Sequence, residues 1–247
     1  PSCNASGVTS FASGTQSLAT GQGSIAMGLM AKSTGQASVS MGSNPLASGD
    51  FAVAMGSQNV VSSGKGSVAM GSSKATGDWS VSLGASSQSS GFASFSGGSM
   101  NTASGDYSAA FGGSCQATGS FSVCMGSGNT ASNTASTAFG ATCKATGSIS
   151  TCMGSGNTAS GTASAAFGES CMAGGQGSFC AGSGSNADGF ASVALGASTF
   201  ATADYAIAIG NGAWAATRAM ALGSSTNATG NFALAGGVGS TAIGAQS

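Results

Sequence analysis

The chain divides into short segments in which small and large residues alternate and a glycine closes each segment. Most segments have seven residues, as in QASVSMG, and glycine closes every one from Gly7 to Gly244 except those ending at Asn133, Ala203 and Thr217. The order inside such a segment is Ser, large, Ala, large, Gly, which is the two-residue period of a β-strand. The closing glycine is expected to provide the positive φ of a tight turn, for which asparagine is the next best residue.

Two kinds of segment alternate along the chain. Type A reads xxSVAMG and type B reads xSxxATG, so the full period is 14 residues. A glycine in nearly every segment and the lack of charged flanks exclude a coiled coil. The spacing shifts only where one segment gains a residue, at 57–64, and where two segments lose one, at 72–77 and 218–223.

This period predicts a single fold for the whole chain. Hairpins of such regularity would need pairs such as Asn-Gly at their centres, whereas parallel stacking of equivalent strands does not. We therefore expect one all-β domain over residues 1–247, a parallel β-solenoid with 14 residues per coil. About 17 coils spaced by about 4.8 Å would form a rod of roughly 80 Å.

Six of the seven cysteines form pairs that recur every 28 residues, which is twice this period. In each pair the first cysteine is third in a B segment and the second is fifth in the next A segment, and these positions face each other across one thin coil. Equivalent cysteines lie two coils apart, about 9.6 Å, which exceeds the roughly 7 Å limit of a disulfide. The spacing therefore predicts three bridges within coils, Cys115–Cys124, Cys143–Cys152 and Cys171–Cys180.

Buried free thiols that act as small hydrophobic groups are the alternative for these six residues. Cys3 has no partner at its matching position, Ala12, which leaves it either free or bonded to another chain. Zinc is not expected, because a strand pair offers only two ligands and the chain has no histidine.

The bridges, if formed, fix which side chains face inward. Small residues at the third and fifth positions then fill a very thin core, and the large fourth and sixth residues of A face outward. A long apolar stripe on a soluble protein marks an interface. The residues expected in this oligomer interface are Val39, Met41, Val53, Met55, Val68, Met70, Phe111, Met125, Phe139, Met153 and Phe167. Without the bridges the parity could be reversed, with the large residues as the core.

The B segments carry polar residues at their outward positions, among them Lys32, Lys74, Gln88 and Lys144. Their sixth positions form a column of Ser and Thr, with threonine at Thr20, Thr34, Thr76, Thr118, Thr146 and Thr202. Flat hydroxyl columns on a solenoid are also typical of ice-binding proteins, which makes ice binding the alternative function. Serine dilutes the column, and the lysines interrupt the adjacent one.

Charge and composition exclude several classes of function. The chain has five Lys and Arg, six Asp and Glu and no histidine, with a net charge of −1. No basic footprint for nucleic acid is present, and a Ser-His-Asp or Cys-His arrangement is impossible. We expect the chain not to be an enzyme and to bind no cofactor or metal. It has no run of about 18 apolar residues, so we expect no segment to insert into a membrane. Asp50, Asp78, Asp106 and Asp204 each open an A segment, where they are expected to bond local backbone N–H groups.

Several aromatic residues stand beside turns or on the polar face. Trp79, Tyr107 and Tyr205 are second in their A segments, and Phe200 and Trp214 are fourth in B. Packing at an edge or against a neighbouring chain is one interpretation, and a binding spot for a glycan or protein is the other. Asn4 and Asn227 are candidate glycosylation sites, meaningful only in a eukaryotic secretory route.

Units such as SMNTASGDYSAAFG, SSKATGDWSVSLG and ASGDFAVAMG resemble the head repeats of YadA-like trimeric autotransporter adhesins, over about residues 8–244. The resemblance implies a left-handed parallel β-roll in which three chains join side by side along an apolar face. It also implies an extracellular or cell-surface, non-enzymatic rod for surface attachment or fibre formation, with a glycan or matrix-protein ligand. The seven cysteines depart from the family, and no neck, stalk or anchor sequence is seen. Both ends read as cut repeats, so end-to-end stacking into filaments is a further expectation.

Overall fold

The computed structural model describes residues 2–58 and 60–245. Every regular element among these residues is a β-strand, and the chain divides into unit 1, Pro1–Cys124, and unit 2, Met125–Ser247. In each unit the backbone winds as a parallel β-solenoid with about 14 residues per coil, and the chain has about 17 coils in all. The predicted fold class and repeat length are therefore confirmed.

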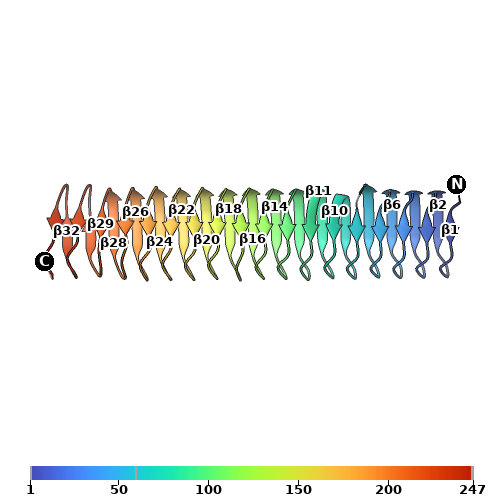
Figure 1. Ribbon diagram of the computed structural model, residues 1–247, viewed down its shortest axis with the longest axis horizontal. Helices are drawn as coiled ribbons and strands as arrows, with labels where there is room; N and C mark the ends of the chain where they lie inside the picture. The colour runs from blue at the N-terminus through green and yellow to red at the C-terminus, as the bar shows by residue number, and fades with distance from the viewer. Residues whose placement is uncertain (1, 59, 246–247) are drawn as a thin grey trace. The chain divides into compact units, whose positions relative to one another are not determined.

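Most coils contribute one longer strand from the A segment and one two-residue strand from the B segment (Figure 1). In unit 1 the longer strands are β2 (Phe11–Thr15), β4 (Ile25–Leu29), β6 (Val39–Ser43), β8 (Val53–Ser57), β10 (Val68–Ala75), β11 (Val81–Ser89), β12 (Phe95–Ser99) and β14 (Ala109–Gly113). The short strands of unit 1 are β1 (Asn4–Ala5), β3 (Leu18–Ala19), β5 (Lys32–Ser33), β7 (Leu46–Ala47), β9 (Val61–Ser62), β13 (Thr102–Ala103) and β15 (Gln116–Ala117). Strand β16 (Val123–Ser127) includes the boundary between the units.

Unit 2 repeats the same alternation. Its longer strands are β18 (Thr137–Ala141), β20 (Thr151–Ser155), β22 (Ala165–Glu169), β24 (Phe179–Ser183), β26 (Val193–Ala197), β28 (Ile207–Asn211), β30 (Met220–Leu222) and β32 (Leu234–Gly236). Its short strands are β17 (Thr130–Ala131), β19 (Lys144–Ala145), β21 (Thr158–Ala159), β23 (Met172–Ala173), β25 (Asn186–Ala187), β27 (Phe200–Ala201), β29 (Trp214–Ala215), β31 (Asn227–Ala228) and β33 (Thr241–Ala242).

Each strand pairs in parallel with its equivalent in the next coil. Strand β6 lies beside β8 with Val39 opposite Val53 and Met41 opposite Met55. In unit 2, β20 lies beside β22 with Met153 opposite Phe167. Residues of one segment position therefore form columns that run from coil to coil, so one side-chain type recurs along one face.

The core is thin and consists of small side chains. In the A strands the fifth residue is buried, as Ala26, Ala54 and Ala69 show with no exposed surface. The large neighbours on either side of it, such as Val53 and Met55, point outward and are half-buried. The reversed parity, with the large residues of the A segments inside, does not occur in residues 2–58 and 60–245. Such a core supplies little apolar area, so the inter-coil backbone hydrogen bonds contribute a large share of the stabilisation.

The closing glycines have two different roles. Those that close A segments have positive φ, for example 126° at Gly42, but they lie inside a strand and do not end it. After a B segment, the positive φ belongs to the second residue that follows, as at Phe51 with φ 60° after Gly49. A Cβ on Gly35 would overlap the carbonyl oxygen of Gly49 in the next coil, so backbone proximity requires glycine there. The expectation of a positive φ at every closing position is thus wrong for B segments, Asn133 included.

The shortened segment at 72–77 changes the local shape of the coil. Strands β10 and β11 run continuously from the A segment into the B segment, and their pairing shifts register between Ser72 and Lys74. One residue fewer leaves no slack for the usual bend in β10, and β11, whose segments have the usual length, is continuous beside it as its pairing partner. The slip predicted from the sequence therefore produces an irregular surface in unit 1.

Candidate functional site

The candidate site is the row of outward side chains at the fourth and sixth positions of the A segments, which we call the apolar face. All the residues expected in the oligomer interface lie on it. Half-buried members are Val39, Met41, Val53, Met55, Val68, Phe111, Phe139 and Phe167. Met70, Met125 and Met153 are more open, each with 41% of its surface exposed. Each side chain is partly covered by its equivalents one coil away, and its outer part stays available for contact.

Aromatic rings reinforce the apolar face in both units. In unit 1 the rings of Phe95 and Phe111 stack at a centroid distance of 4.8 Å beside Gly97. A Cβ on Gly97 would lie 3.1 Å from the Phe95 ring and 3.3 Å from the Phe111 ring, so the glycine makes room for the stack. In unit 2 the rings of Phe167 and Phe179 lie 5.6 Å apart. The face thus combines flexible methionines with rings that neighbouring coils hold in place.

Directly behind the apolar face, the cysteines occupy the core positions assigned from their spacing. All six are buried. Cys143 contacts Cys152 through a side-chain hydrogen bond, and Cys171 contacts Cys180 in the same way. Ser73 and Ser82 hold the equivalent positions in unit 1, where Ser73 Oγ donates to Ser82 O at 2.7 Å. The third position of B therefore faces the fifth position of the next A.

Burial makes the thiols of Cys152 and Cys180 poor nucleophiles. Loss of solvation, followed by the neighbouring Cys171, raises the pKa of the Cys180 thiol to about 12. Burial and the contact with Cys143 raise the pKa of Cys152 well above its usual range. The thiolate is the reactive form, so neither thiol is suited to nucleophilic catalysis near neutral pH. No disulfide joins Cys143 to Cys152 or Cys171 to Cys180 in the structure, and the bridges stay a prediction.

Asparagines occupy the same core position in the coils between the cysteine pairs. Asn157 Nδ2 donates to the carbonyls of Met153 and Gly168 at 2.7 Å each, and its Oδ1 accepts the N–H of Cys171 at 2.7 Å. Asn101 and Asn129 bond in the same pattern. Each amide therefore ties three successive coils together and satisfies its own buried polar atoms.

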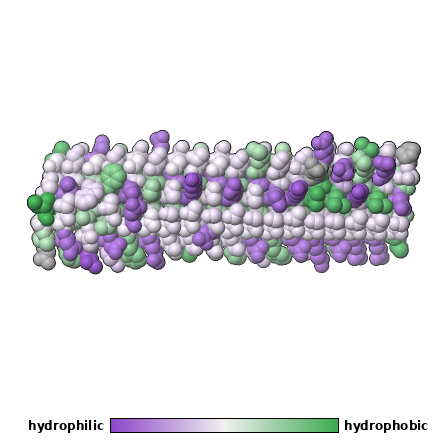
Figure 2. Space-filling view, in the orientation of Figure 1, coloured by the Kyte–Doolittle hydropathy of each residue, from purple (hydrophilic) through white to green (hydrophobic). Residues whose placement is uncertain are grey.

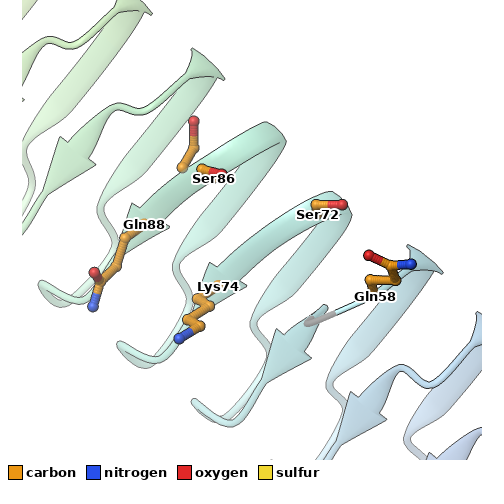
Figure 3. Close-up of a pocket in the computed structure, with 6 residues that line it drawn as sticks. Gln58, Ser72, Lys74, Ser86 and Gln88 are labelled. Atoms are coloured by element: carbon orange, nitrogen blue, oxygen red, sulfur yellow. The ribbon is translucent and has the colours of Figure 1, made fainter.

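The opposite face carries the polar side chains of the B strands. The surface in Figure 2 is mostly near-neutral in hydropathy, with scattered hydrophilic and hydrophobic side chains. A hollow of about 550 Å³ in unit 1 is lined by Gln58, Ser72, Lys74, Ser86, Ser87 and Gln88, at the irregular strands β10 and β11. Figure 3 shows Lys74 and Gln88 on adjacent strands, pointing to the same side. The hollow is shallow and follows from the register shift.

The aspartates that open A segments bond the preceding coil. Asp106 Oδ1 accepts the N–H of Phe92 at 2.9 Å, and Asp204 Oδ1 accepts the N–H of Phe190 at 2.9 Å. Asp50 and Asp78 accept from their neighbours in the same way. The expectation of backbone bonding is confirmed, but the donor is one coil away and is not local.

Beside these aspartates, aromatic side chains line the turn between B and A. Tyr107 stacks on Phe121 at 5.1 Å and meets the edge of Phe92 at 5.4 Å. Trp79 lies over Gly66, where a Cβ would come within 2.5 Å of the indole ring. Trp79, Tyr107 and Tyr205 are the aromatic residues expected beside this turn, and the phenylalanines that complete the rows were not among the candidates. Their recurrence near the start of successive A segments is the signal that would have found them.

The remaining candidates are separate from the apolar face. Phe200 and Trp214 are neighbours on the paired strands β27 and β29 of the B side. Of the two sequons, Asn4 is exposed and Asn227 is half-buried with a buried Oδ1. Cys3 is exposed, and its Sγ donates to Gly14 O at 2.6 Å.

The described residues contain no group of three or more His, Cys, Asp or Glu side chains placed to bind a metal ion. No helix with the length and hydrophobicity to span a bilayer occurs in residues 2–58 and 60–245.

Comparison with known families gives one match. The profile of the YadA head domain repeat (2 copies) matches residues 5–29, 19–44, 33–59, 47–73, 116–142, 187–213 and 215–237. These ranges are distributed over both units and together cover more than half of the chain. The search of curated proteins found no match to the chain.

Proposed function

Since the chain belongs to the YadA head repeat family, we propose that it is a non-enzymatic, extracellular, adhesive or structural rod. In this proposal three chains join side by side through their apolar faces. The trimer then presents its polar B faces and its turns to the surroundings. Many weak contacts to a glycan or matrix protein add up to firm attachment.

The apolar face that each unit carries is the observation that supports this proposal. Valine, methionine and phenylalanine repeat on it in both units, and a monomer would leave this row in water. Small residues alone would suffice for the fold, because the large side chains lie outside the core. Covering a half-exposed Met or Val contributes about 1 kcal/mol, and the contribution recurs in every coil.

Sedimentation equilibrium tests the assembly. The wild-type chain of 22.9 kDa is expected to sediment at three times that mass. Met41→Lys combined with Met55→Lys places two charges on adjacent strands of the apolar face, and the protein is expected to be monomeric and folded. Thr102→Lys combined with Gln116→Lys adds the same charge to the B face and is expected to remain trimeric. Sedimentation of the wild-type chain as a monomer would contradict the proposed trimer.

Two further parts of the proposal concern cysteines and filaments. If the chain folds in an oxidising compartment, disulfides would join Cys115 to Cys124, Cys143 to Cys152 and Cys171 to Cys180. End-to-end contact between trimers would extend them into fibres. Electron microscopy of the native assembly tests the second part, because isolated particles of a single length would contradict it.

Ice binding has less support than adhesion. The Ser/Thr column lies exposed on the B side, but Gly174 and Asp188 interrupt it and Lys32, Lys74 and Lys144 project beside it. Ordered water needs a flat and regular surface, and this one is broken in both units. Thermal hysteresis at millimolar protein is expected to be absent.

A further inference from the structure

Unit 1 carries four methionines in one unbroken column of the apolar face, which we call the methionine column. Its members are Met27, Met41, Met55 and Met70, the sixth residues of four successive A segments. The paired strands place Met27 opposite Met41, Met41 opposite Met55 and Met55 opposite Met70. Opposite residues of adjacent parallel strands are about 4.8 Å apart, so three successive methionines span about 9.6 Å.

The fold does not require methionine in this column. The sixth position carries other large apolar side chains elsewhere, such as Leu83 on β11 and Leu195 on β26, and these are half-buried as well. Met27 and Met70 keep 37% and 41% of their surface exposed, and the two methionines between them are half-buried. The four thioether groups therefore extend from the outer side of the sheet and are not needed to fill the core.

The methionine column places several sulfur atoms within reach of one ion. A methionine side chain has three rotatable bonds and a polarizable sulfur, so neighbouring sulfurs can lean toward the strand between them. Met41 and Met55 each have a methionine on both sides, and each can therefore be the middle ligand of three. The fourth positions of the same strands carry Ile25, Val39, Val53 and Val68. Sulfur is thus the only side-chain heteroatom at the outward fourth and sixth positions of these coils.

We propose that the methionine column binds a soft, monovalent cation, copper(I), through three thioether sulfurs. Sulfur ligands select copper(I), whereas imidazole suits zinc and oxygen ligands suit magnesium and calcium. Thioethers are neutral and do not balance a second positive charge, which favours a monovalent over a divalent ion at an apolar surface. The lack of histidine argues against zinc but leaves these ligands in place. The site goes beyond the proposed function and needs no second chain.

The other sulfur groups of the chain are less suited to this ion. Met153 lies between Phe139 and Phe167 on the paired strands, so no methionine is opposite it. The six cysteines of the core are buried. Cys3 is exposed, and a thiolate is a stronger ligand for copper(I) than a thioether is. Cys3 is therefore replaced by serine in every chain used for the test.

The test is titration of the full chain carrying Cys3→Ser with copper(I) in ascorbate, with bicinchoninate as the competing chelator. Met41→Leu combined with Met55→Leu removes both middle ligands. It is expected to weaken binding about 100-fold or more, since loss of an outer-shell partner alone costs about 10–100-fold. Leucine conserves volume and apolar character, so the fold and the proposed trimer are expected to persist. Circular dichroism verifies the fold.

The matched control is Met125→Leu combined with Met153→Leu. It removes the same number of thioethers from A segments between which Phe139 stands, and is expected to leave the affinity within about twofold. X-ray absorption at the copper edge is expected to show sulfur ligands alone. Zinc(II) is expected not to compete with copper(I) for the site.

Several results would overturn the assignment. They are no uptake of copper(I) by the Cys3→Ser chain, unchanged affinity in Met41→Leu with Met55→Leu, nitrogen or oxygen ligands at the copper, and equal affinity for zinc(II). If that double variant does not fold, Met41→Leu alone replaces it, because it leaves no three adjacent methionines. Sedimentation of the same samples separates the two proposals. A monomer that binds copper(I) contradicts only the trimer, and a trimer that takes up none contradicts only the metal site.

Discussion

At the scale of single residues, the solenoid depends on a backbone conformation that its side chains do not favour. The second residue of most segments has positive φ, and many of these residues are not glycine, such as Ile149 with φ 58° and Ala163 with φ 56°. Each costs roughly 1 kcal/mol relative to a relaxed turn. The glycines that close B segments have ordinary φ and are required by the next coil. Glycine at the second position of an A segment therefore relieves strain, whereas alanine in place of the glycine that closes the preceding B segment would overlap the next coil.

Ala163→Gly is expected to raise the free energy of unfolding by roughly 1 kcal/mol, because it relieves the left-handed strain at an exposed position. Gly161→Ala, two residues earlier, is expected to lower it by about 2 kcal/mol or more, because its Cβ would overlap the carbonyl oxygen of Gly175. Urea unfolding of both variants measures the difference. Loss of stability in Ala163→Gly would contradict the role assigned to the second position.

At the scale of strands and turns, the sequence predicts the repeat, and its parity only through the proposed cysteine pairing, but not the contacts between coils. Alternation in segments such as KGSVAMG indicates strands, and the cysteine spacing indicates which residues face inward. The recurrence of phenylalanine near the start of successive A segments marks the rows on the turns, but the inter-coil bonds of Asp106 and the place of positive φ were not predictable in this way. These features depend on contacts with residues of the adjacent coil, and the local sequence does not show those contacts.

The cysteine pairs belong to this scale because each one closes a single coil. In protein made in an oxidising compartment, denaturation and alkylation without reductant are expected to modify only Cys3. The intact mass should be lower by two hydrogens per bridge. Reduction should lower the free energy of unfolding by roughly 3 kcal/mol per bridge, since each loop is about ten residues long. Alkylation of all seven cysteines would establish the buried thiols instead.

At the scale of the whole molecule, stability is distributed along the coils. Each strand pairs only with its neighbours one coil before and one coil after, as β20 does with β18 and β22. The architecture is therefore quasi-one-dimensional, and the number of coils is adjustable. The 14-residue repeat length is not adjustable, because a shift of one segment would place a B strand in the column of A strands.

Deletion of residues 143–170 removes two whole coils from unit 2 and joins Thr142 to Cys171, which is equivalent to Cys143. The shortened chain is expected to fold with an unchanged β-sheet spectrum and a melting temperature within a few degrees of the wild type. Deletion of residues 141–147 removes one B segment and is expected to lower the melting temperature strongly or to prevent folding. Thermal unfolding followed by circular dichroism compares the two. Similar loss in both would contradict the repeat-wise distribution of stability.

The inter-coil bonding has a consequence for lifetime outside a cell. Trypsin-like proteases cleave after Lys or Arg, and all five such residues lie where the backbone N–H is bonded to an adjacent coil or strand. A protease needs an extended, unbonded segment in its cleft, so the coil must open before it is cut. Digestion should therefore proceed from frayed ends inward, and the intact middle should persist long after an ordinary domain of this length has been degraded.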